Sequence, residues 1–202
     1  MTIGAVIFDF GNVLVGWDPE NLYRRLIPDA EARRHFLTHV CSPAWNLEQD
    51  RGRPWAEAID LLVAKHPEQA DLIRAFHAEW DDMITGPVAE GHDILDRVLD
   101  AGIPAYGLTN WSGETYDTRG HHLPFTRHMR YVAVSGHLKM VKPEPDIYHH
   151  LLEKIALPPE QCVFIDDSER NIEAAEKIGI KAVHFKNDGT TLARLRALGL
   201  AI

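Results

Sequence analysis

The sequence has little cysteine and no long apolar run. Its two cysteines, Cys41 and Cys162, lie far apart among 202 residues and form neither a Cys-x-x-Cys pair nor a zinc-ligand spacing, which indicates reduced thiols. No apolar stretch approaches the ~20 residues that a membrane-spanning helix requires, and the first residues lack the basic segment of a signal peptide. We therefore expect a cytoplasmic protein with no membrane partner.

Basic residues are scarce relative to acidic ones. The chain has 21 Lys and Arg against 30 Asp and Glu, a formal charge of −9, whereas nucleic-acid-binding domains carry a basic face. No G-x-G-x-x-G or G-K-[ST] segment supports nucleotide binding, and the 12 histidines show no H-E-x-x-H spacing for a transition metal. We expect no nucleic-acid partner and a monomer or homodimer that acts on a small molecule.

Short, continuous apolar runs are present, and most of them end in polar residues. The runs, with the polar residues that follow three of them, are 3–8 with Asp9, 103–108 with Thr109 and Asn110, 162–165 with Asp166 and Asp167, and 181–185. Such runs are typical of strands buried on both faces of a parallel sheet. Helical periodicities lie between them, at 94–99, 147–155 and 172–178. This alternation predicts an α/β fold with a Rossmann-like open parallel sheet.

The segment 16–87 has a different pattern. Asp18 and Pro19 form an N-cap and first-turn pair that predicts the start of a helix. The apolar residues that follow have helical spacing, and no run in this segment is typical of a strand. We therefore expect an α/β catalytic core formed by residues 1–15 and 88–202, with residues 16–87 inserted as an all-helical cap domain.

The polar residues at the predicted strand ends are candidates for chemistry. Ligands of open α/β sheets bind at the carboxyl ends of the strands, so Asp9, Asp166 and Asp167 should meet there. Carboxylates this close raise one another's pKa unless a cation neutralises them, and oxygen ligands suit Mg²⁺. An ionised Asp is also a nucleophile that can form an aspartyl-phosphate. Lys142, after the apolar run 132–135, is the best-placed cation to stabilise transferred phosphoryl oxygens.

Four short segments together indicate a family. In chain order they are Asp9-Phe10-Gly11-Asn12-Val13-Leu14, Leu108-Thr109-Asn110, Lys142-Pro143-Glu144 and Phe164-Ile165-Asp166-Asp167-Ser168. Over nearly the whole chain this order resembles the haloacid dehalogenase superfamily, and the helical segment after the first motif is similar to that superfamily's C1-type cap. The D-x-G-N-V-L opening resembles the glucose-1-phosphatase-like phosphatase branch.

The resemblance implies a role for each matching residue. Asp9 would be the nucleophile. Thr109 and Asn110 would bind the phosphoryl oxygens through a hydroxyl and a backbone N–H, and Lys142 would neutralise the nucleophile and the transferred group. The Mg²⁺ ligands would be Asp9, Asp166, Asp167 and the backbone carbonyl of Gly11. The expected function is a Mg²⁺-dependent phosphomonoester hydrolase of a small metabolite, such as a sugar phosphate.

Gly11 departs from the family pattern. Family phosphatases usually carry a second Asp at this position as general acid to the leaving group, and such an acid typically contributes ~10²–10⁴-fold to the rate. A good leaving group, a cap residue or a water molecule could compensate. Two alternatives stay open. One is a 2-haloacid dehalogenase-type hydrolase, whose relatives need no metal and have an aromatic residue here. The other is a catalytically weak binding or regulatory protein.

Three further residues are candidates for substrate specificity. Arg51 lies between two predicted cap helices, where C1 caps resemble one another in presenting a specificity loop. Trp17 and Trp111 closely follow motif residues and are expected near the mouth of the site. The cap residues Trp45, Trp55 and Trp80 are expected in the apolar core of the cap.

Overall fold

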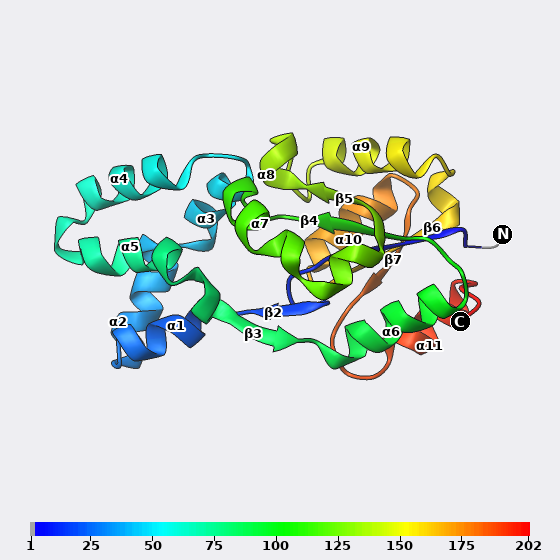
Figure 1. Ribbon diagram of the computed structural model, residues 1–202, viewed down its shortest axis with the longest axis horizontal. Coiled ribbons are helices and arrows are strands. Elements are labelled where there is room, and N and C mark those ends of the chain that lie inside the picture. The colour runs from blue at the N-terminus through cyan, green and yellow to red at the C-terminus, as the bar shows by residue number, and fades with distance from the viewer. Residues whose placement is uncertain (1–2) are drawn as a thin grey trace.

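The centre of the molecule is a five-stranded parallel sheet. The structure is a computed structural model that describes residues 3–202. The strands are β1 (Ala5–Phe8), β4 (Ala105–Thr109), β5 (Met129–Val134), β6 (Cys162–Asp166) and β7 (Lys181–His184), in the order β5-β4-β1-β6-β7 (Figure 1). The predicted open parallel sheet is confirmed. Because β1 is central, Asp9 follows it at the carboxyl edge, between the ends of β4 and β6.

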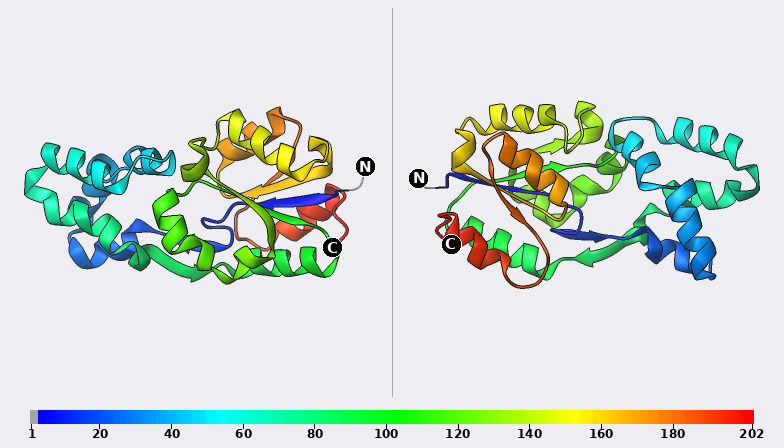
Figure 2. Two further views of the ribbon diagram at one scale, coloured as in Figure 1. Left: turned by 45° about the horizontal axis from the view of Figure 1, so that its top comes forward. Right: turned by 180° about the vertical axis from the view of Figure 1, so that it is seen from behind.

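Helices cover both faces of this sheet. Ala5 and Ile7 of β1 pack in a core with α9 (Pro145–Ile155) and α10 (Glu169–Lys177). Val6 and Phe8 belong to a second core, on the other face, with α6 (Ala89–Asp100) and α11 (Thr191–Ala197). Figure 2 shows these two helix pairs on opposite sides of the sheet. Since successive side chains of a strand point to opposite faces, a strand covered twice reads as an unbroken apolar run.

The segment between β4 and β5 consists of short helical turns. They are α7 (Gly113–Thr118), η4 (Gly120–His122) and η5 (Pro124–His128), and α8 (Ser135–Leu138) and η6 (Pro159–Gln161) lie further along. The helices predicted at 94–99, 147–155 and 172–178 are confirmed as α6, α9 and α10. Gly102 and Gly179, just after α6 and α10, have positive φ, as helix-ending glycines do.

Helices form a separate body beside the sheet, on the left of Figure 1. They are α1 (Pro19–Leu26), α2 (Ala30–His35), η1 (Phe36–Val40), α3 (Pro43–Asp50), α4 (Trp55–Lys65), η2 (Pro67–Gln69), α5 (Ala70–Ala78) and η3 (Trp80–Met83). The carboxylate of Asp18 accepts a hydrogen bond from Glu20 N and Pro19 opens α1, as the sequence predicts. Among residues 3–202, no helix has the length and apolar character that crossing a bilayer demands.

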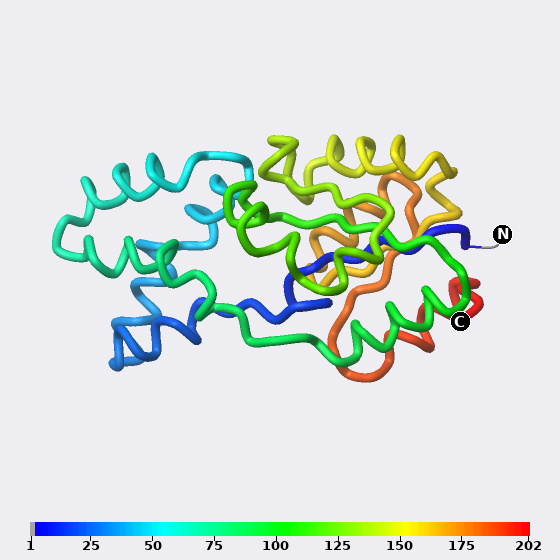
Figure 3. Tube along the Cα trace, in the orientation of Figure 1, coloured from blue at the N-terminus to red at the C-terminus, as the bar shows by residue number. Residues whose placement is uncertain are grey.

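Two short strands join this helical body to the sheet. β2 (Val15–Trp17) and β3 (Ile84–Pro87) pair antiparallel, and Figure 3 shows these two runs of chain side by side. The prediction that 16–87 contains no strand is therefore wrong at both of its ends. The strands span three and four residues and contain Gly16, Gly86 and Pro87, so neither has the apolar run by which a strand is recognised. The exact domain division at 15/16 and 87/88 stays a prediction.

Candidate active site

Three carboxylates meet at the carboxyl edge of the sheet. Asp9, Asp166 and Asp167 each offer an oxygen, and these atoms lie within 4.8 Å of one another. Asp9 is 7% exposed and Asp166 is fully buried. Burial raises the pKa of Asp9, and the charges of Asp166 and Asp167 add to that rise while Lys142 opposes it. Burial and the charge of Asp166 likewise raise the pKa of Asp167. The group is therefore unstable as three bare anions.

Hydrogen bonds from neighbouring residues hold these carboxylates in place. Asp166 accepts bonds from Ser168 N at 2.8 Å and from Asn171 Nδ2 at 3.0 Å to each oxygen. Asp9 Oδ1 accepts a bond from Phe10 N at 2.7 Å. Asp167 Oδ2 accepts one from the Asn12 side chain at 3.2 Å. The carboxylates are thus held by residues of the loops that follow β1 and β6 and by Asn171 of helix α10.

Lys142 lies between two of the three carboxylates. Its Nζ is 2.8 Å from Asp9 Oδ1 and 2.7 Å from Asp166 Oδ2, and the residue is 2% exposed. Burial alone would lower the pKa of Lys142, but the charges of Asp166 and Asp9 outweigh it and raise that pKa above its ordinary value. One lysine against three carboxylates leaves surplus negative charge, and an all-oxygen donor set with that charge fits a hard divalent cation such as Mg²⁺.

Thr109, Asn110 and Gly11 lie beside this cluster. Thr109 is the buried last residue of β4. The side chain of Asn110 bonds to the backbone of Lys142, accepting from its N–H at 2.8 Å and donating to its carbonyl at 3.0 Å. A Cβ added at Gly11 would meet no atom within 4 Å, and its φ is not in the positive range. The Gly11 position therefore opens onto free space and could hold a side chain.

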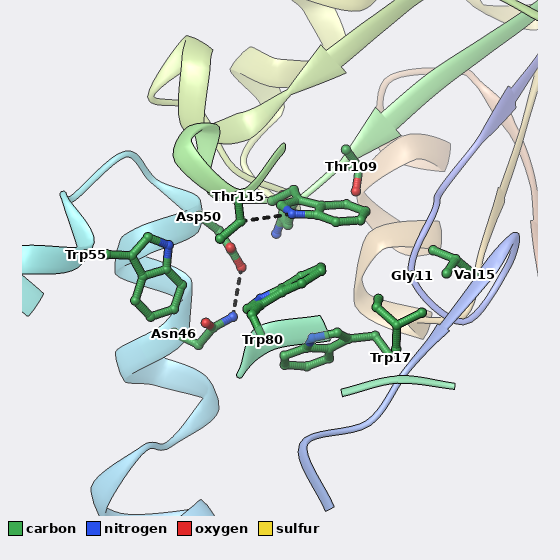
Figure 4. A pocket seen from close by; sticks show the side chains of 12 residues that line it. Gly11, Val15, Trp17, Asn46, Asp50, Trp55, Trp80, Thr109 and Thr115 are labelled. Atoms are coloured by element: carbon green, nitrogen blue, oxygen red, sulfur yellow. Dashed lines mark hydrogen bonds between the residues drawn. The ribbon is translucent and has the colours of Figure 1, made fainter. Parts of the chain in front are cut away.

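That free space is a small apolar cavity between the sheet and the helical body (Figure 4). Its volume is about 100 Å³. The lining residues are Gly11, Val15, Trp17, Asn46, Asp50, Trp55, Trp80, Ile84, Thr109, Asn110, Trp111 and Thr115. A larger groove of about 860 Å³ also contains Trp17, Asn46, Asp50 and Asn110, and extends to Lys142 and Asn171. The larger groove thus reaches Lys142, whose Nζ contacts Asp9 and Asp166.

The three predicted specificity residues have different surroundings. Trp17 and Trp111 line the small cavity, and their role in specificity stays a prediction. Arg51 lines neither hollow. Its guanidinium makes two hydrogen bonds of 2.8 Å to the two carboxylate oxygens of Glu144. This ion pair joins the end of α3 to the loop before α9, and it argues against a contact of Arg51 with substrate.

Sequence reasoning missed other lining residues. Trp55 and Trp80 were expected in the cap core, yet both also face the cavity. Asp50 and Asn46 line it from α3 and are hydrogen-bonded to each other, Asn46 Nδ2 to Asp50 Oδ2, at 3.2 Å. Their spacing indicates that Asn46 and Asp50 share a face of the helix, because residues four apart lie on the same side. Only the packing of α3 shows that this face borders the cavity.

Comparison with known proteins agrees with this geometry. The family profile described as haloacid dehalogenase-like hydrolase matches residues 3–179. A sesquiterpene phosphatase of Aspergillus oryzae is 26% identical over 98% of this chain and 97% of its own length.

Two solved structures illustrate the likeness of fold. A HAD family enzyme from Bacteroides thetaiotaomicron, solved as a magnesium complex, has a TM-score of 0.72 at 22% identity over 96% of this chain and 100% of its own. The L-2-haloacid dehalogenase of Xanthobacter autotrophicus, with chloropropionic acid covalently bound, has a TM-score of 0.64 at 18% identity over 100% of this chain and 85% of its own. At these identities the likeness concerns the fold.

Proposed function

The chain belongs to the haloacid dehalogenase-like hydrolases, and on that basis we propose that it is a Mg²⁺-dependent phosphomonoester hydrolase that works through an aspartyl-phosphate on Asp9. The observation that carries the proposal is Lys142 Nζ between Asp9 and Asp166, with Asp167 beside them. This arrangement combines a nucleophile, a fixed cation and the oxygen donors for a metal in one buried place.

The metal would be held by Asp9, Asp166, Asp167 and the backbone carbonyl of Gly11. When bound, Mg²⁺ supplies positive charge that offsets the phosphoryl oxygens and the clustered carboxylates. The donor set supports this assignment because it consists of oxygens alone and, among residues 3–202, has Lys142 as its one ion-pair partner. The magnesium complex of the Bacteroides relative is consistent with it.

The protein residues would perform two displacements at phosphorus. In the first, Asp9 attacks, an Asp9–phosphorus bond forms and the ester oxygen leaves. In the second, water attacks the same phosphorus and releases inorganic phosphate. Lys142 would balance the charge on Asp9 and the transferred group, and the Thr109 hydroxyl with the Asn110 backbone N–H would bind phosphoryl oxygens. The burial of Asp9 and Lys142 strengthens these electrostatic interactions because water is excluded.

The rest of the substrate would lie among the tryptophans of the small cavity. Trp17, Trp80 and Trp111 offer flat apolar surface, which packs against the ring face of a sugar or an apolar group. Within residues 3–202, the buried indole Nε1 of Trp17 has no hydrogen-bond partner, so it could donate to a substrate oxygen. A sugar phosphate stays a prediction, as do the cytoplasmic location, the monomeric or homodimeric state and the phosphatase branch.

The dehalogenase alternative is less well supported by the geometry. A metal-free site would leave Asp166 and Asp167 beside Asp9 with one lysine for three carboxylates. A binding protein would have the same pocket but would not turn over a substrate. Measurement of turnover therefore distinguishes this alternative.

The test is phosphate release from a panel of sugar, alkyl and aryl phosphates, with Mg²⁺ and with EDTA. We expect turnover that needs Mg²⁺ and is abolished by Asp9→Asn, while the control Asp60→Asn, an exposed acid on α4, remains active. Turnover that survives EDTA or Asp9→Asn would refute the mechanism. Chloride release from 2-chloropropionate without metal would favour a dehalogenase, and no release of either product would favour a binding protein.

A further inference from the structure

On the Gly11 side, the wall of the small cavity has no titratable side chain. When Asp9 displaces an alkyl ester, the departing oxygen becomes a strongly basic alkoxide unless it receives a proton as the bond breaks. Gly11 has no side chain to provide one. Of the residues that line the small cavity, Asp50 alone has a titratable side chain. Asp50 is buried, and the proposed two-step mechanism gives it no role.

We propose that Asp50, on helix α3 of the inserted segment, is the general acid that protonates the leaving group, in a role that rests on the proposed phosphatase activity. Figure 4 shows Asp50 and Asn46 on one side of the cavity, with Gly11 and Thr109 on the other. A substrate whose phosphoryl group meets Thr109 and whose leaving group occupies the cavity would therefore present that leaving group to Asp50.

The surroundings of Asp50 suit an acid. It is the last residue of α3 and is 9% exposed. Asn46 Nδ2 donates to Asp50 Oδ2 at 3.2 Å, which holds that oxygen in place. Asp50 also lines the larger groove that reaches Lys142. The residue is thus shielded from solvent on its own side and faces the place where substrate would bind.

The electrostatics around Asp50 favour a proton near neutral pH. Burial raises the pKa of Asp50 to about 7, while the backbone of Ser112 and the charge of Lys142 act in the opposite direction. A group with a pKa near the working pH is the most effective general acid. The other charged or titratable groups on α3 and on the elements packed against it are either paired or exposed. Arg51 pairs with Glu144, and His137 pairs with Asp117. The exposed groups are Glu48, His39 and Lys139.

Other acidic groups in the larger groove are engaged or do not ionise readily. Asp18 caps α1 by accepting from Glu20 N at 2.9 Å. Glu20 Oε2 is 2.6 Å from Arg33 Nε. Burial raises the pKa of the Cys41 thiol to about 12, so it does not cycle its proton at neutral pH. Asp50 is the acid that remains.

The proton balance closes over the two displacements. As the Asp9–phosphorus bond forms and the ester bond breaks, the proton of the Asp50 carboxyl moves to the ester oxygen, and a neutral alcohol leaves. The Asp50 carboxylate then accepts a proton from the water that attacks the aspartyl-phosphate. Inorganic phosphate forms, Asp9 is restored as a carboxylate, and Asp50 ends protonated as it began.

The experiment compares an alkyl phosphate with 4-nitrophenyl phosphate, whose leaving group departs without a proton. In Asp50→Asn we expect kcat for the alkyl ester to fall ~10²–10³-fold, with KM little changed. For the aryl ester kcat should stay within about threefold, as general-acid catalysis is not needed. The alkyl-ester rate of the unaltered enzyme should decline above about pH 7, and Asp50→Asn should lose this decline. Glu48→Gln, an exposed acid on the same helix, is the matched control.

A double variant tests the same role of Asp50 by placing an acid on the Gly11 side of the cavity. Because the Gly11 position has open space and no positive φ, Gly11→Asp combined with Asp50→Asn should restore alkyl-ester turnover at least tenfold over Asp50→Asn alone. Equal losses for both esters in Asp50→Asn, or an unchanged alkaline decline, would overturn the acid role.

A third measurement needs no variant. The dependence of kcat on leaving-group pKa should be shallow at pH 6 and steep at pH 9 in the unaltered enzyme, and the same slope at both pH values would overturn the role. The proposed function has its own readout, because Asp9→Asn must abolish turnover of both esters. If the unaltered enzyme hydrolyses neither ester, the phosphatase assignment itself fails and the role of Asp50 fails with it.

Discussion

Asn110 and Lys142 exchange two hydrogen bonds across the site. The amide oxygen of Asn110 accepts from Lys142 N at 2.8 Å, and its Nδ2 donates to Lys142 O at 3.0 Å. The side chain of one strand-end residue therefore holds the backbone of the lysine, whose Nζ reaches Asp9 and Asp166. The side chain of Asn110 therefore positions Lys142, and this role is separate from the phosphate contact proposed for the Asn110 backbone N–H.

Asn110→Ala should reduce turnover while leaving the backbone N–H of Asn110, the proposed phosphate donor, in place. Loss of both bonds frees the Lys142 backbone, and a displacement of about 1 Å at a catalytic site costs ~10²-fold in rate. We also expect stability to fall by about 1–3 kcal/mol, because buried backbone groups lose their partners. Steady-state kinetics and urea denaturation measure the two effects.

A matched control is Asn21→Ala, which removes a bond from Asn21 Nδ2 to Asp82 O, 2.7 Å long, remote in sequence from the site residues. It should leave kcat unchanged. If Asn110→Ala loses stability but keeps its full kcat, the side chain only supports the fold.

Magnesium should stabilise the protein against heat. A ligand at a hundred times its Kd stabilises the folded state by ~2.7 kcal/mol, which corresponds to about 5–10 °C for a chain of this size. The shift should be larger at pH 8 than at pH 5, because the pKa values of Asp9 and Asp167 are raised and protonated carboxyls do not bind metal. Differential scanning fluorimetry measures this. Asp167→Asn should abolish most of the shift, and an unaltered shift in that variant would exclude Asp167 as a ligand.

Asp50 should make the folded protein less stable as pH rises. Its pKa is about 7 in the folded state and near 3.9 when unfolded. The folded state therefore keeps a proton that the unfolded state has lost. The stabilisation is fully present below about pH 4, declines by about 1.4 kcal/mol per pH unit above it, and is gone above about pH 7.

Asp50→Asn removes this dependence. Its stability relative to the unaltered protein should improve progressively from about pH 4 to about pH 7 and then level off, measured by urea denaturation in EDTA. The exposed Asp60→Asn should show no such trend. A difference between Asp50→Asn and the unaltered protein that is constant over this pH range would contradict the raised pKa.

The Arg51–Glu144 pair should contribute little to stability. Both side chains are partly exposed, at 35% and 46%, and such pairs contribute ~0.2–1 kcal/mol. A double-mutant cycle with Arg51→Ala and Glu144→Ala measures that coupling. If the pair only joins α3 to the loop before α9, both variants should change KM by the same factor. A rise in KM for Arg51→Ala but not for Glu144→Ala would support the predicted contact of Arg51 with substrate.

The pattern of apolar and polar residues along the chain was sufficient to predict the sheet and the residues at its strand ends. Strands covered on both faces are continuous apolar runs, and the polar residues after β1, β4 and β6 could be assigned to one edge because parallel strands end together. Asp9, Thr109, Asp166 and Asp167 were therefore predictable, and order along the chain added Lys142.

Which residues of the inserted segment face the site depends on long-range packing. β2 and β3 form because residues about 70 apart pair with each other, which no local pattern records. Arg51 and Asp50 are neighbours at the end of α3, where successive side chains point about 100° apart. The sequence favours Arg51 because it lies between two predicted helices, yet Arg51 points to Glu144 and Asp50 lines the cavity. The direction in which a helix presents its residues is fixed by what it packs against, so the acid opposite Gly11 could be found only in the folded chain.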